Sequence, residues 1–152
     1  MKRYLMICLI MFTTSVVCAQ NENPNFDKAL ADSLGADEYG MKSYVLAILK
    51  AGSNESKDEN FLNTVFRGHM ENIGRLSAQG MLSLAGPFGA NNKNYRGIYI
   101  FNVKTIPEAE ELIKTDPAIE QKVLEAELYE WYGSAAIATH LDTHKRIATT
   151  NP

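Results

Sequence analysis

The chain has 152 residues, a formal net charge of −3 and 45% hydrophobic residues, values typical of a small globular protein. An acidic chain without a basic cluster is poorly suited to binding nucleic acid or an anionic membrane surface. Beyond the first twenty residues, no apolar run approaches the roughly 20 residues needed to span a bilayer.

The first nineteen residues have the pattern of a secretory signal peptide. A Lys-Arg pair is followed by an apolar run over residues 4–17 and then by Cys18 and Ala19. We expect cleavage after Ala19 and a bacterial periplasmic or secreted protein of 133 residues, with a net charge of −5 because two basic residues are lost. Both cysteines would be lost too, which excludes thiol chemistry and disulfides. Lipidation at Cys18 and retention as a membrane anchor are the alternatives.

The mature chain begins with a leader over residues 20–40, in which residues 26–34 can form a short helix ended by Gly35. The compact domain is expected over residues 41–133. Strands are predicted at 43–49, 81–85, 97–103 and 124–132, with helices at 58–79 and 107–114 and a helical turn opening at Asp116. This βαββαβ order predicts an α+β, ferredoxin-like fold. Residues 134–152 form a C-terminal helical tail.

The strand pattern predicts that the second face of this sheet is covered. The two helices of such a fold cover only one face, so the other face should alternate with polar residues if it met water. Residues 43–49 and 97–103 are instead apolar on both faces. A second copy of the sheet, forming a homodimer, is the favoured cover. The competing cover is the chain's own C-terminal helix.

His69 is the first candidate for chemistry. At 100° per residue it falls near the middle of the apolar stripe of the 58–79 helix and therefore faces the sheet. A histidine in such a position is often a hydrogen-bonded core group, and it can also be a catalytic group. Position alone does not choose between the two.

Asp116 is the second candidate. Followed by Pro117, it has the pattern of a helix N-cap, which is a purely structural role. The fold also brings this segment to the layer that holds the long helix. A carboxylate beside a buried imidazole would fix the tautomer of the imidazole and stabilise its protonated form, which makes a general acid or base.

Several stretches of the chain form a recognisable set: residues 67–76, 79–88, 96–101, 115–118 and 130–133. As a set they resemble the YciI-like (YCII-related) family over residues 43–133. The resemblance implies a dimeric α+β barrel and an active site built on a His–Asp pair, whose positions match His69 and Asp116. It also implies varied small-molecule chemistry, including dehydrochlorination and hydrolase-like reactions.

Three further residues are candidates for substrate binding. Arg96, at the entrance of a strand, could hold a carboxylate through two hydrogen bonds. Gly86 and Pro87 could let the backbone approach a ligand closely, and they could equally just end a strand. Tyr129 and Trp131 share one strand face and are interpreted as packing or interface residues.

No metal site is expected. His140 and His144 are four residues apart, a spacing that can hold zinc on a helix, but no third ligand is evident. The metalloprotease motif also lacks its glutamate here, so a solvated tail is the preferred interpretation.

The sequence therefore favours an exported, cofactor-independent enzyme of the lyase or hydrolase type, with a small-molecule substrate and His69 and Asp116 as the acid/base pair. The alternative is a non-catalytic module of the same fold that binds a small ligand or takes part in assembly, because the fold alone does not fix the activity.

Overall fold

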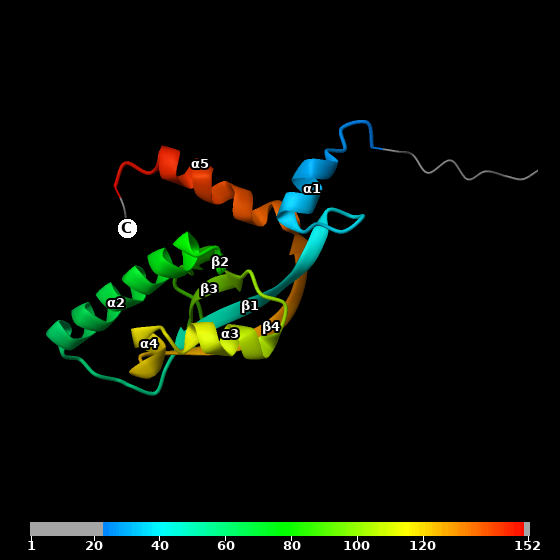
Figure 1. Cartoon of the computed structure of the whole chain (residues 1–152). Coiled ribbons are helices and arrows are strands. Elements are labelled where there is room, and N and C mark those ends of the chain that lie inside the picture. Colours follow the sequence, from blue (N-terminus) through cyan, green and yellow to red (C-terminus); the bar gives the residue numbers. More distant parts are fainter. Residues whose placement is uncertain (1–22, 151–152) are drawn as a thin grey trace, which may run out of the picture.

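A computed structural model describes residues 23–150 of the chain. The expected signal peptide, with its cleavage site, lies outside these residues. Within them, no helix is long and apolar enough to cross a membrane. The elements in chain order are α1 (Lys28–Leu34), β1 (Met41–Ala51), α2 (Glu59–Ala78), β2 (Leu82–Pro87), β3 (Tyr95–Phe101), α3 (Ile106–Ile113), α4 (Pro117–Glu120), β4 (Leu124–Ser134), the 3-10 helix η1 (Ala135–Thr139) and α5 (His140–Ile147) (Figure 1).

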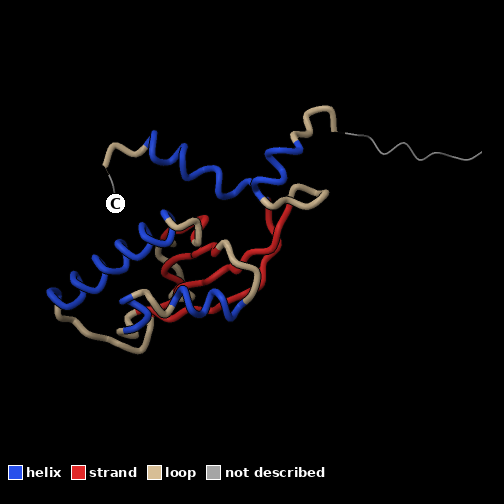
Figure 2. The backbone as a smooth tube through the Cα atoms, in the orientation of Figure 1, coloured by secondary structure: helices blue, strands red, loops and turns tan. Residues whose placement is uncertain are grey.

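The four strands form one antiparallel sheet in the order β2-β3-β1-β4 (Figure 2). With α2 between β1 and β2, and α3 between β3 and β4, this is the ferredoxin-like topology, and the predicted α+β fold class is confirmed. The third strand was predicted two residues late. β3 ends at Phe101, and the backbone N–H of the next residue, Asn102, donates to the carbonyl of Met81 in the turn that precedes β2.

One face of the sheet carries the core. Side chains alternate between the two faces of a strand, so Val45 and Ala47 of β1 share a face with Tyr99 and Phe101 of β3. All four are at most 2% exposed. They pack in one cluster with residues of α2, α3 and α4, among them Val65, Leu76, Ala109, Ile113 and Ala118.

Local signals fix the ends of the long helix. The carboxylate of Asp58 accepts the backbone N–H groups of Asn60 and Phe61 and so caps the start of α2. Gly80 follows the helix with a φ of +71°, a left-handed conformation that glycine adopts without a steric penalty. These bounds agree with the helix predicted over residues 58–79.

The second face of the sheet is covered at one end. The Tyr44 hydroxyl donates to the carbonyl of Ser134 at 3.0 Å, and η1 contacts β1 and β2. Tyr44 is fully buried, whereas Leu46, Ile48 and Ile98 on the same face are only partly buried. The C-terminal segment thus covers part of this face. α5 itself contributes no buried residue.

Candidate functional site

The structure brings His69 and Asp116 into direct contact. Nδ1 of His69 lies 2.8 Å from Oδ2 and 3.0 Å from Oδ1 of Asp116. The aspartate side chain is fully buried, and the histidine side chain is 12% exposed. Because an ionised carboxylate can only accept hydrogen bonds, Nδ1 carries the shared proton and donates it. Nε2, on the other side of the ring, is then the unprotonated nitrogen of the neutral imidazole and can exchange a proton with a bound molecule.

The position of His69 follows from the periodicity of α2. His69 lies one turn after Val65, which is buried, and one turn before Asn72, which is also buried. The imidazole therefore points to the sheet, as the stripe predicted. Phe66 covers it from one side, with an edge-on contact of 6.0 Å between ring centroids, and is itself 41% exposed.

Asp116 has both of the roles considered from the sequence. Its Oδ1 accepts the backbone N–H of Ala118 at 2.9 Å, so it is the N-cap of α4. The same carboxylate binds His69. The cap holds the carboxylate at a fixed place, and this place is where the imidazole of α2 reaches it.

Tyr99 is a member of the site that the sequence interpretation missed. Its hydroxyl donates to Oδ2 of Asp116 at 3.0 Å and lies 3.2 Å from Nδ1 of His69. Burial and the nearby negative charge of Asp116 raise the pKa of Tyr99 far above its usual value. The available signal was a tyrosine at an inward-facing position of a strand, since a buried tyrosine hydroxyl needs a hydrogen-bond partner.

Close packing next to the pair sets the distance between α2 and α4. A Cβ atom added to Gly68 would lie 2.9 Å from Cγ of Pro117, which is too close. Gly68 and Pro117 are the chain neighbours of His69 and Asp116. The absence of a side chain at Gly68 therefore lets the two members of the pair approach each other.

A second cluster of hydrogen-bonded polar side chains lies one turn after His69 along α2. The Nη2 atom of Arg75 donates to Oδ1 of Asn72 at 2.6 Å and to the Thr115 hydroxyl at 2.8 Å. The guanidinium of Arg75 thus binds neutral oxygens that belong to α2 and to the residue before Asp116. These contacts support the loop that carries Asp116.

The structure places the three candidate substrate-binding residues differently. Arg96 is exposed and lies at an irregularity in the pairing of β3 with β1, where Leu49 pairs with Gly97 and Lys50 with Tyr95. Strand alternation therefore does not place its side chain on either face of the sheet. Pro87 pairs with Gly97 and lies on the helix-facing side. β2 continues through Pro87, which is tolerated because β2 is an edge strand.

The strands β2 and β3 approach each other closely where Gly86 pairs near Gly97. A Cβ atom on Gly97 would lie 2.8 Å from the carbonyl oxygen of Gly86, whereas a Cβ atom on Gly86 would meet open space. The glycine that the packing requires is therefore Gly97. Nothing in the packing requires a glycine at position 86.

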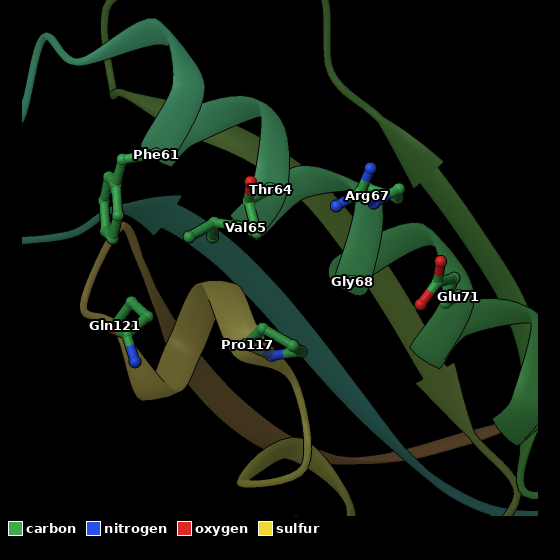
Figure 3. A pocket seen from close by; sticks show the side chains of 8 residues that line it. All are labelled: Phe61, Thr64, Val65, Arg67, Gly68, Glu71, Pro117 and Gln121. Carbon is green, nitrogen blue, oxygen red and sulfur yellow. The ribbon is translucent and has the colours of Figure 1, made fainter.

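A surface groove runs along the seam between α2 and α4, with a volume of about 500 Å³ (Figure 3). It includes Gly68 and Pro117 but not His69, so it opens on the outer side of the pair. Its walls combine apolar, polar and charged side chains: Phe61, Thr64, Val65, Arg67, Glu71 and Gln121.

The two C-terminal histidines remain apart from this site. His140 and His144 lie on α5, and Nδ1 of His140 contacts the carbonyl of Ile137 at 2.5 Å. Among residues 23–150, no group of three or more His, Cys, Asp or Glu side chains is arranged to hold a metal ion.

No protein-family model and no curated protein matches the chain. Among solved structures, the chain is similar to the 5-chloro-2-hydroxyhydroquinone dehydrochlorinase of Burkholderia phenoliruptrix AC1100, solved in complex with 2,5-dihydroxybenzoquinone. The identity is 16%, the TM-score is 0.41, and the match covers 57% of this chain and 92% of that chain. The resemblance to the YciI-like family thus stays an interpretation of the sequence motifs.

Proposed function

We propose that the protein acts on a small molecule bound beside His69, as a lyase or hydrolase in which His69 is the general acid or base and Asp116 orients it. The observation that carries this proposal is the 2.8 Å contact between Nδ1 of His69 and the fully buried carboxylate of Asp116. A buried carboxylate on one nitrogen fixes the tautomer and offsets the positive charge that the ring acquires on protonation.

The chemistry needs only this pair. In an elimination, Nε2 takes a proton from a substrate carbon, the C–H electron pair becomes a double bond, and the leaving group departs with its own bonding electrons. The imidazolium then returns its proton to the leaving group or to solvent. In a hydrolysis, Nε2 instead takes a proton from an attacking water. A positioned group of this kind contributes about 10²–10⁴ in rate.

The test is activity profiling against small halogenated, phenolic and carbonyl compounds. His69→Gln should reduce any turnover found by at least about 100-fold. His140→Gln is the matched control, because it removes a histidine from exposed α5 and should leave the rate unchanged. A substrate that is turned over at the wild-type rate by His69→Gln contradicts the proposal.

A non-catalytic binding module is the second candidate function. One observation favours it: the His69 side chain is only 12% exposed, and the groove between α2 and α4 does not include it. In that case His69→Gln would leave the affinity for a ligand unchanged, and no compound would be turned over. Calorimetric binding assays on both proteins separate the two functions.

We also propose a homodimer formed through the second face of the sheet, where Leu46, Ile48 and Ile98 are partly exposed. Burying these side chains against a second copy would remove apolar surface from water. Light scattering coupled to gel filtration should give twice the chain mass for the wild type. Ile98→Asp should give the chain mass, and a wild-type monomer would exclude the dimer.

Export is a further part of the proposal. It rests on the signal-peptide pattern of the first nineteen residues. Mass spectrometry of the protein purified from its native host should give a chain that begins at Gln20. An intact Met1 or a lipid-modified Cys18 would contradict it.

A further inference from the structure

Tyr99 occupies a site made for it by two alanines. In the sheet, Tyr99 of β3 pairs with Ala47 of β1 on one side and with Ala85 of β2 on the other. Because neighbouring strands lie close together, larger side chains at these two positions would occupy the space around the phenol ring. The small neighbours leave room for the ring under α2, where Tyr99 is 2% exposed.

The hydrogen bonds to the Asp116 carboxylate follow from the donors around it. Tyr99 has one hydroxyl proton, and the nearest acceptor with a free lone pair is Oδ2 of Asp116, at 3.0 Å. The Asp116 carboxylate then accepts from three donors: the Tyr99 hydroxyl, Nδ1 of His69 and the backbone N–H of Ala118. The cap bond fixes one oxygen, and the tyrosine bond fixes the other.

The Tyr99 hydroxyl does not accept the Nδ1–H proton that His69 donates to Asp116. Its oxygen lies 3.2 Å from Nδ1 and 3.4 Å from Nε2 of His69. An atom almost equally distant from both ring nitrogens lies between them and so is not in line with either N–H bond. The two rings are stacked, at an angle of 24° between their planes. Tyr99 therefore acts on His69 through Asp116 and through ring packing.

We propose that Tyr99 is the positioning residue of the His69–Asp116 pair. Its hydroxyl holds the orientation of the Asp116 carboxylate, so that His69 keeps its proton on Nδ1 and presents Nε2 to the ligand. This inference deepens the proposed function and rests on it for its catalytic meaning. The geometry that it describes exists before any substrate binds.

The raised pKa of Tyr99 means that its hydroxyl stays a hydrogen-bond donor to Asp116. Burial raises the pKa of its hydroxyl, and the negative charge of Asp116 raises it further. The hydroxyl thus keeps its proton at every physiological pH. A serine or water in its place could turn its proton elsewhere, whereas the phenol is held by its packed ring.

The test is the tautomer of His69, read from long-range ¹H–¹⁵N correlation spectra of ¹⁵N-labelled protein. In the wild type, neutral His69 should be protonated on Nδ1. Tyr99→Phe keeps the ring and removes the hydroxyl, and should lower the ratio of the Nδ1–H to the Nε2–H form by about fivefold, the effect of one lost hydrogen bond. On a substrate, the same variant should lower kcat by about the same factor and leave KM unchanged.

Tyr44→Phe is the matched control. Tyr44 is as buried as Tyr99 and also donates a hydrogen bond, but to the carbonyl of Ser134 on the other face of the sheet. It should leave the tautomer ratio of His69 unchanged. A wild-type ratio in Tyr99→Phe overturns the proposal, and so does an equal shift in both variants, which would mean a general loss of packing.

Two further outcomes keep the inference separate from the proposed function. If no variant of His69 alters turnover but Tyr99→Phe still shifts the tautomer ratio, the proposed catalysis fails and the positioning stands. If Tyr99→Phe does not fold, the wild type decides the question. The Tyr99 hydroxyl proton should then be visible at low temperature and close to the His69 ring protons, and its absence overturns the proposal.

Discussion

Nδ1 of His69 lies 2.8 Å from Oδ2 of Asp116, although 47 positions separate the two residues in the chain. The contact joins the middle of α2 to the N-cap of α4. The same carboxylate therefore caps the start of α4, accepts a hydrogen bond from the imidazole of α2 and accepts another from the hydroxyl of Tyr99. Any change at Asp116 should thus be felt both in stability and in the state of the imidazole.

The first prediction concerns the stability that Asp116 provides. Asp116→Ala removes an N-cap and leaves the buried Tyr99 hydroxyl and the imidazole N–H without an acceptor. We expect the free energy of unfolding to fall by about 2–4 kcal/mol, the sum of a lost cap and of unpaired buried donors. Urea unfolding followed by circular dichroism measures it.

Asp58→Ala is the control for this prediction. Asp58 caps α2 through the backbone N–H groups of Asn60 and Phe61 and is exposed. It should cost only about 1 kcal/mol, because a cap alone is lost. Equal losses in Asp58→Ala and Asp116→Ala would mean that Asp116 is a cap and nothing more.

The second prediction concerns the two glycines of α2. Glycine to alanine in a helix usually stabilises by about 1 kcal/mol. Gly74→Ala should give that gain, since a Cβ atom there meets nothing within 4 Å. Gly68→Ala should not give this gain in stability, because its Cβ atom would press on Pro117 and move α2 away from α4.

A second measurement for the same variants is the NMR resonance of the His69 Nδ1–H proton. Gly68→Ala should weaken the hydrogen bond between His69 and Asp116, seen as a shift of the Nδ1–H proton resonance, while Gly74→Ala leaves that resonance in place. A Gly68→Ala variant as stable as Gly74→Ala, with an unchanged resonance, would show that the close contact with Pro117 does not control the pair.

The third prediction is a loss of stability at alkaline pH. The pKa of Tyr99 is raised in the folded protein by burial and by the charge of Asp116, so the folded state holds this proton more tightly than the unfolded state. The resulting stability is complete below about pH 10 and is lost as the pH rises through the raised folded pKa, by about 1.4 kcal/mol per pH unit.

Tyr99→Phe should therefore make the decline of stability above pH 10 less steep than in the wild type, measured by urea unfolding at a series of pH values. Tyr132→Phe should have a smaller effect. The hydrogen bond to Asp37 raises the pKa of Tyr132 only to about 12, at an exposed site. An unchanged slope in Tyr99→Phe would mean that Tyr99 ionises in the folded protein as readily as in the unfolded chain.

Much of this arrangement could be predicted from local patterns. The apolar stripe of α2 turned His69 to the sheet, and the Asp-Pro pair marked both a cap and a carboxylate at the right layer. These features depend on residues three or four positions apart, where the helical period decides the direction of a side chain.

The features that the sequence did not show depend on strand register and on contacts between elements. Arg96 was considered for substrate binding because it lies at the entrance of a strand, and in the structure it lies at an irregularity between β3 and β1. Tyr99 was not singled out as a site residue, because its partner, Asp116, comes from another element. A one-residue step changes the face of the sheet, so single strands do not show which side chains will meet.

The C-terminal tail differs from expectation for a similar reason. A single helix was predicted, and the structure has η1 followed by α5. The short 3-10 segment contacts β1 and β2, and this tertiary packing is not encoded in the period of the tail itself. Within the single chain, η1 therefore covers part of the second face of the sheet.

The most direct test of the central claim is a double-mutant cycle of kcat/KM with His69→Gln, Asp116→Asn and both together, on any substrate found by profiling. If the two residues form one acid/base unit, the double variant should be no slower than His69→Gln alone, since the carboxylate acts only through the imidazole. Losses that add in full, or single variants at the wild-type rate, would contradict the account.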